Sequence, residues 1–130
     1  MLVVLDTNIL VSALWSKNGS PAKILGMVFR GDLTPCYDWR ILAEYQAVLN
    51  RPKFHFSQAE VNILIDWIRI YGNSVIPTPV VDTFIDESEK KFYEVAKECH
   101  ALLVTGNIKH YPDDPLVCSV QDFLVKTHSA

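Results

Sequence analysis

Short apolar runs alternate along this chain with longer segments in which apolar residues recur every three or four positions. Two of the runs, Leu2–Leu5 and Ala101–Val104, are unbroken, which is typical of strands buried on both faces. Shorter runs predict further strands at residues 33–37, 74–77 and 116–118. Because Pro35 has no N–H group, the strand that contains it should be short or lie at a sheet edge.

Helices are predicted between these strands. Their approximate ranges are 9–15, 20–31, 38–50, 57–72 and 88–99, with a last helix after Cys118 that runs through Lys126. Ser20 and Asp38 are expected N-caps, and Ser57-Gln58-Ala59-Glu60 has the spacing of a capping box. The alternation predicts the α/β class, with a central parallel sheet of four to five strands covered by helices on both faces.

The composition fits one folded domain over residues 1–130. The chain is 49% apolar and 21% charged, which is enough hydrophobic content for a core. Three cysteines without a Cys-x-x-Cys pair argue against a disulfide framework and predict reduced thiols. No apolar run reaches the length of a membrane span, and no signal-peptide pattern opens the chain, so we expect a cytoplasmic protein without a membrane partner.

Two of the predicted strands end in polar tripeptides, Asp6-Thr7-Asn8 and Thr105-Gly106-Asn107. Ligands of open parallel sheets bind outside the carboxyl ends of the strands, so both tripeptides should face one crevice if their strands are central. The alternative interpretation of Asp6 is a cap of the helix that follows it.

Further acidic residues fall on helices near this crevice. Glu44 lies at the border of an apolar helix face, which favours either a crevice residue or a solvated flank. Asp86 and Glu89 have capping-box spacing and either start a helix or add carboxylates to the same site. Oxygen ligands without a suitable Cys/His set favour Mg²⁺ or Mn²⁺ over zinc. The net charge of −3 argues against non-specific nucleic-acid binding. It does not exclude a nuclease, because carboxylates that bind a metal ion also make the net charge more negative.

Four motifs in sequence order resemble the PIN domain family. They are Asp-Thr-Asn after the first strand, Leu-Ala-Glu-Tyr leading to Leu-Asn-Arg-Pro-Lys-Phe, an acidic segment before Phe-x-x-x-Ala, and Val-Thr-Gly-Asn followed by Lys-His-Tyr-Pro. More narrowly, the chain resembles the PIN-type toxins of bacterial and archaeal toxin–antitoxin systems. The resemblance covers nearly the whole chain and implies a single PIN-like domain.

The resemblance implies a hydrolase: a ribonuclease that depends on Mg²⁺ or Mn²⁺ and cleaves phosphodiester bonds of single-stranded RNA. By register with the family motifs, the expected metal ligands are Asp6, Glu44 and Glu89, with Asp86 as the alternative to Glu89. The same three acids are expected to be catalytic, together with Thr105 and Asn107, which would orient water or phosphate. Residues expected to contact the RNA are Asn8, Lys109 and His110.

The resemblance also implies two protein partners, a cognate antitoxin and a second copy of the chain. An apolar helix face around Leu64 and Trp67 could form such a homodimer or belong to the core. Trp15, Trp39 and Trp67 could stack on RNA bases, but we expect them to pack in the core or at a partner interface.

Two departures from the family pattern support an alternative function. Glu89 stands where aspartate is usual, and its extra methylene changes the reach to a metal ion that demands strict geometry. Asn107 stands where many members have a fourth aspartate. The alternative is a catalytically weak or inactive PIN-like binding or assembly module. A phosphotransfer domain with Asp6 as nucleophile is disfavoured, because Asn8 stands where that signature needs aspartate.

Overall fold

Five parallel strands form the central sheet of this computed structural model, which describes residues 1–128. The strands are β1 (Leu2–Leu5), β2 (Thr34–Tyr37), β3 (Asn73–Ser74), β4 (Leu102–Val104) and β5 (Val117–Cys118), in the spatial order β3-β2-β1-β4-β5. Each neighbouring pair is parallel. The predicted α/β class and strand number are confirmed, and β1 and β4 lie side by side within the sheet.

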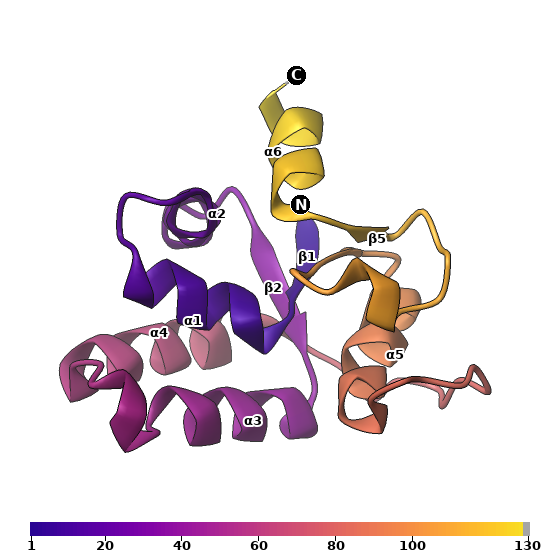
Figure 1. Cartoon of the computed structure of the whole chain (residues 1–130), viewed down its shortest axis with the longest axis horizontal. Coiled ribbons are helices and arrows are strands. Elements are labelled where there is room, and N and C mark those ends of the chain that lie inside the picture. Colours follow the sequence, from indigo (N-terminus) through magenta and orange to yellow (C-terminus); the bar gives the residue numbers. More distant parts are fainter. Residues whose placement is uncertain (129–130) are drawn as a thin grey trace.

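Helices cover both faces of this sheet. They are α1 (Thr7–Trp15), α2 (Ser20–Phe29), α3 (Trp39–Leu49), α4 (Gln58–Tyr71), α5 (Lys90–Cys99) and α6 (Val120–His128), with 3₁₀ turns η1 (Pro52–Phe54), η2 (Glu87–Glu89) and η3 (Ile108–His110). Figure 1 shows α1, α3 and α4 on one side of the sheet and α5 on the other. No helix within residues 1–128 is long and apolar enough to cross a membrane.

Local sequence signals explain where most helices begin. The Asp38 carboxylate accepts a hydrogen bond from the Ile41 N–H at 3.0 Å, and the Ser57 hydroxyl accepts one from the Glu60 N–H at 3.4 Å, so both predicted caps are confirmed. The N-cap of α2 is Gly19 rather than Ser20, which is already helical. The reason is local, because Pro21 is compatible with either of the first two helical positions.

The strand that contains Pro35 was expected to be short or to lie at a sheet edge, and only the first of these holds. Strand β2 is short, but it lies between β1 and β3 rather than at an edge. The Thr34 N–H donates to the Met1 carbonyl on the β1 side at 2.8 Å. Because N–H groups alternate in direction, Pro35 faces the β3 side, where pairing begins only at Cys36. The missing donor therefore costs no ladder bond.

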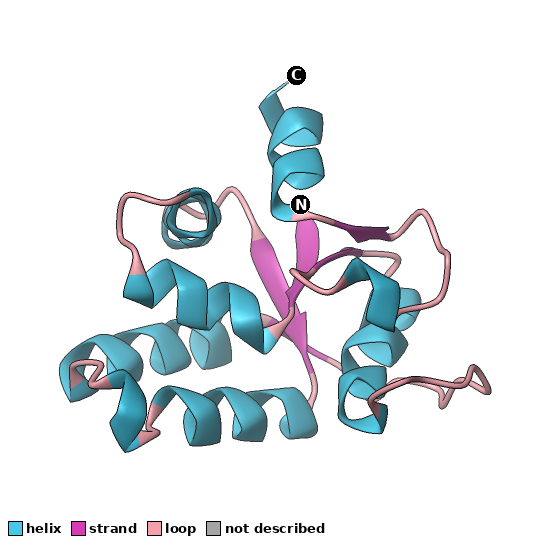
Figure 2. Ribbon diagram, viewed as in Figure 1, coloured by secondary structure: helices cyan, strands magenta, loops and turns pink. Residues whose placement is uncertain are grey.

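The third strand is shorter than predicted. It ends at Ser74, and Figure 2 shows an extended loop between β3 and η2. Pro77 and Pro79 fall in this segment, and each removes a backbone donor that a sheet would need.

The core fills the space between the sheet and the two helix layers. Fully buried side chains come from β1 and β4, from α3 and α5, and from α6; examples are Val4, Tyr45, Phe92, Leu103 and Phe123. Leu64 is 1% exposed and therefore belongs to the core, not to a dimer face. The expectation of core packing is wrong for Trp15 and Trp39, which are 64% and 77% exposed.

Candidate active site

The sheet register brings the two polar tripeptides together. Asp6 follows β1 and Thr105 follows the adjacent β4; the Asp6 N–H donates to the Val104 carbonyl at 3.0 Å. The Thr105 hydroxyl donates to Asp6 Oδ2 at 2.8 Å, and the Gly106 N–H donates to Asn8 Oδ1 at 3.3 Å. The two tripeptides at the strand ends thus lie side by side, as expected for neighbouring central strands.

Asp6 is a buried carboxylate with two hydroxyl donors. It is 4% exposed, and Tyr111 joins Thr105 by donating its hydroxyl to Asp6 Oδ2 at 2.9 Å. Asp6 also occupies the N-cap position of α1; its side chain makes no capping hydrogen bond of normal geometry there, although the nearby Asn8 N–H acts to lower its pKa. Burial raises the pKa of Asp6 against the lowering effect of the two hydroxyls, and the nearby Glu44 charge adds to the increase.

Glu44 reaches from α3 toward the same strand end. Its Oε2 accepts a hydrogen bond from the Thr7 hydroxyl, and its Oε1 lies 2.7 Å from Lys91 Nζ on α5. The Lys91 side chain is only 12% exposed, and its ammonium also lies 5.1 Å from the centre of the Phe92 ring. Glu44 is therefore a crevice residue rather than a solvated flank.

Glu89 comes from a third element, η2, and is 8% exposed. Its Oε1 lies 2.9 Å from His110 Nδ1, so His110 is a hydrogen-bond partner of this acid rather than an isolated surface residue. Burial raises the pKa of Glu89, and the hydrogen bond to His110 acts against that increase; the Asp6 charge adds to it. Asp6 therefore interacts electrostatically with both of the other acids.

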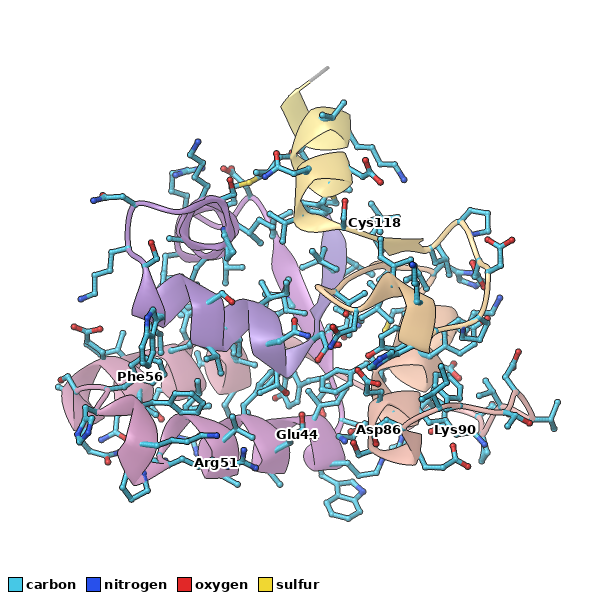
Figure 3. All side chains as sticks on the ribbon, in the orientation of Figure 1. Glu44, Arg51, Phe56, Asp86, Lys90 and Cys118 are labelled. Atoms are coloured by element: carbon cyan, nitrogen blue, oxygen red, sulfur yellow. The ribbon has the colours of Figure 1, made fainter. Side chains whose placement is uncertain are left out.

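The remaining predicted residues lie around these acids in different roles. Asp86 is exposed and accepts hydrogen bonds from the Ser88 N–H at 2.9 Å and the Ser88 hydroxyl at 2.6 Å, so it caps η2. Figure 3 shows Asp86 near Glu44 in projection, the two residues coming from η2 and α3. Asn107 and Lys109 are exposed, and the Asn107 N–H donates to the Thr105 hydroxyl at 3.0 Å.

The donor set is chemically suited to a hard divalent cation. The three inner acids offer only oxygen atoms, which Mg²⁺ and Mn²⁺ prefer. Within the described residues, however, no group of three or more His, Cys, Asp or Glu side chains is gathered closely enough to hold an ion as it stands. Glu44 and Glu89 already have nitrogen partners, Lys91 Nζ at 2.7 Å and His110 Nδ1 at 2.9 Å.

Sequence reasoning missed two residues of this site. Tyr111 contacts Asp6, and Lys91 contacts Glu44. The available signals were the aromatic residue two positions after Lys109 and the basic residue directly before Phe92. Neither signal specifies a contact, because each partner lies on a distant segment of the chain.

A family model described as PIN domain matches residues 2–109 of this sequence. The chain belongs to the PIN domain family. PIN domains are generally nucleases and typically depend on divalent metal ions. The match to this PIN domain includes Asp6, Glu44, Glu89 and Thr105, and it ends just before His110 and Tyr111.

Two known proteins are similar to this PIN domain. An uncharacterized protein of Methanocaldococcus jannaschii is 32% identical over 108 residues, which are 81% of this chain and 70% of that protein. Among solved structures, VapBC2 from Rickettsia felis, bound to a DNA fragment from their promoter, superposes with a TM-score of 0.59 and 19% identity. That superposition covers 92% of this chain and 97% of the other, and it establishes similarity of fold.

Proposed function

We propose that this PIN domain is a metal-dependent endoribonuclease that cleaves phosphodiester bonds of single-stranded RNA. The main support is that Asp6, Glu44 and Glu89 come from three separate elements and that Asp6 interacts electrostatically with both of the others. The Glu44 charge raises the pKa of the buried Asp6 and the Asp6 charge raises the pKa of Glu89, and such perturbed acids are typical of functional sites.

The proposed roles follow from the contacts of each residue. Asp6 and Glu89 would hold Mg²⁺ or Mn²⁺, and Glu44 would hold it directly or through water. An ion held there would supply an activated water molecule and neutralise charge on the phosphate. Thr105 and Tyr111 fix the Asp6 carboxylate through its Oδ2, and Thr7 orients Glu44.

The exposed loop residues are assigned to the RNA. Asn107 orients water or phosphate next to Thr105, while Asn8 and Lys109 contact the strand. When no ion is bound, the Lys91 ammonium offsets the charge of Glu44 and the His110 imidazole hydrogen-bonds Glu89, which limits the repulsion between the three carboxylates.

We further propose that the protein is a cytoplasmic toxin with a cognate antitoxin. The structural similarity to VapBC2, which was solved bound to a DNA fragment from their promoter, supports this partner class. We also propose that the protein forms a homodimer. Its interface does not include Leu64, because that side chain is buried.

One observation favours the alternative, a PIN-like binding module with little or no catalysis. Two of the three acids already have nitrogen partners, the Lys91 ammonium and the His110 imidazole, and these would compete with a metal ion. If these residues kept the metal ion out, catalysis would be lost, but the fold and any surface that binds a partner would be unaffected.

The decisive experiment is cleavage of end-labelled single-stranded RNA by the purified protein in Mn²⁺, in Mg²⁺ and in EDTA. We expect cleavage with either metal, none in EDTA, and a loss of at least about 100-fold in Asp6→Asn. The matched control is Asp66→Asn on α4, where the carboxylate is exposed and pairs with Arg69. Calorimetry should show weaker Mn²⁺ binding to Asp6→Asn and unchanged binding to Asp66→Asn.

The outcomes separate the two functions. Metal-dependent cleavage that survives in Asp6→Asn would place the activity elsewhere or in a contaminant. A folded wild-type protein that cuts no RNA with any metal would favour the binding module.

A further inference from the structure

An open cavity of about 570 Å³ lies next to the candidate active site. One wall is α3, which contributes Trp39, Ala43 and Glu44; the other is formed by the loop at Pro79 and by the start of α5. Glu44 and Lys91 line this cavity and also belong to the acidic site. A strand held at the acids would therefore continue into it.

The spacing along α3 explains why an aromatic ring stands at the mouth of this cavity. The buried face of α3 consists of Ile41, Tyr45 and Leu49. Trp39 and Ala43, four positions apart, share another face, so the ring cannot reach the core. The small Ala43 side chain leaves space one turn from the indole.

Trp39 is available to a ligand. It is 77% exposed, and none of the ring contacts within the described residues involves it. Its backbone is fixed at the start of α3 by the Asp38 cap, which accepts from the Ile41 N–H. Trp39 therefore presents an exposed indole face from a fixed point of the backbone.

The cations that line the cavity differ in how far they are neutralised. Arg40 pairs with Asp38 at 2.6 Å and with Glu94 at 3.0 Å, and Lys91 pairs with Glu44. Lys90, labelled in Figure 3, forms none of the ion pairs seen within residues 1–128. Its ammonium is free to meet an anion from a ligand.

We infer that this cavity is a nucleotide subsite for single-stranded RNA, in which one base stacks on the Trp39 indole and a neighbouring phosphate contacts the Lys90 ammonium. The inference rests on the proposed function, since it takes the strand from the acidic site. An exposed aromatic ring beside a free cation is the chemistry that recognises unpaired nucleotides. Residues Trp39 and Lys90 then determine which part of the strand lies at the acids.

The test measures RNA binding separately from cleavage. The probe is fluorescein-labelled single-stranded RNA of random sequence, about 12 nucleotides long, with anisotropy recorded in EDTA. Trp39→Ala should weaken binding about 10-fold, because one base stack is lost, and Trp39→Phe should restore most of it. The matched control is Trp15→Ala: Trp15 is 64% exposed but packs edge-on against Phe54 and Phe56, and its loss should change RNA affinity less than about 2-fold.

Two further readouts distinguish stacking from a general loss of structure. An abasic ribose-phosphate strand of the same length should bind wild type and Trp39→Ala equally, because it has no base to stack. Lys90→Gln should reduce the slope of log K against log salt by about 0.7, as expected for one lost phosphate contact on a single strand. With metal present, Trp39→Ala should raise KM for RNA while kcat changes little.

The outcomes for the subsite and for the ribonuclease are distinguishable. Binding that depends on Trp39 in a protein that cleaves no RNA supports the subsite and refutes the nuclease. Cleavage and binding that are the same in Trp39→Ala and Trp15→Ala overturn the subsite and leave the nuclease standing. A wild-type protein without measurable RNA affinity also overturns the subsite, and assigns Trp39 to a protein partner instead.

Discussion

The aspartates of this chain show how far a side chain's surroundings determine its chemistry. Asp6 is buried next to other acids, and burial raises its pKa. At Asp114, burial also acts to raise the pKa, but hydrogen bonds from the Leu116 N–H, the Tyr93 hydroxyl and the Lys97 ammonium outweigh it and leave the pKa lowered. Asp6 is thus suited to a chemical role. Asp114 instead connects the loop before β5 to α5 through Tyr93 and Lys97.

Asp114→Asn should therefore reduce stability in a pH-dependent way. Because the folded-state pKa lies below the ordinary value near 3.8, the stabilisation is fully present above that value and is lost as pH falls through the folded pKa. At pH 7 we expect a loss of about 1 to 2 kcal/mol in the free energy of unfolding. Urea unfolding at pH 7 and below pH 4 measures it, and the difference from wild type should shrink in acid.

The neighbouring Asp113 provides the control, since it is exposed. Asp113→Asn should leave urea unfolding unchanged within about 0.5 kcal/mol at pH 7. An Asp114→Asn deficit that stayed constant down to pH 2 would contradict the electrostatic origin.

At the scale of elements, one guanidinium joins α3, α5 and the long loop after β3. Arg40 pairs with Asp38, which caps α3, and with Glu94 on α5. The other oxygen of Glu94 accepts the Val80 N–H at 3.0 Å, so the loop is tied to the same group. Asp38 and Glu94 are 2% and 5% exposed, so Arg40 pairs with two buried carboxylates.

Removing that cation should be costly. Arg40→Ala leaves two buried carboxylates without their ion pair, and we expect a loss of about 3 to 5 kcal/mol in the free energy of unfolding. Arg30→Ala is the matched control, because Arg30 pairs with Asp32 in an exposed bridge and should cost at most about 1 kcal/mol. Equal losses in the two variants, measured by thermal unfolding at pH 7, would refute the network.

At the scale of the whole molecule, the fold extends beyond the segment that matches the PIN family model. The match ends at residue 109, whereas β5 pairs with β4 through Leu103 and Val117. Phe123 on α6 is fully buried, and Tyr111 donates to Asp6. The assignment of residues 1–130 to one domain stays a prediction, but the core clearly draws on this last part.

A chain truncated after residue 109 should therefore fail to fold cooperatively. It would expose the edge of β4 and lose several buried apolar side chains, each worth about 1.5 to 3 kcal/mol, which is comparable in sum with the stability of a domain. Near-ultraviolet circular dichroism during heating should show no sharp transition. The full chain with Val125→Ala, a position 67% exposed, should melt like wild type. A cooperative transition in the truncated chain would show that the last part is dispensable.

The sequence pattern was sufficient to predict the fold class and to select Asp6 at the end of the first strand. It did not predict the order of the strands in the sheet. It was insufficient where an outcome depended on neighbours. Pro35 is tolerated inside the sheet because β3 begins one residue later. Trp39 is exposed because the buried face of α3 lies elsewhere, whereas Leu64 is in the core.

The sequence by itself determined the elements, since periodicity, caps and prolines act within a few residues of each other along the chain. It also supplied Asp6, Glu44 and Glu89 as candidates, because their residue types and positions are visible without a structure. Only the tertiary structure decided which donors meet them: Thr105, Tyr111, Lys91 and His110 come from segments far away in the chain. The physical reason is that burial and pairing, which set the charge and reach of each acid, arise from packing between elements that local sequence does not encode.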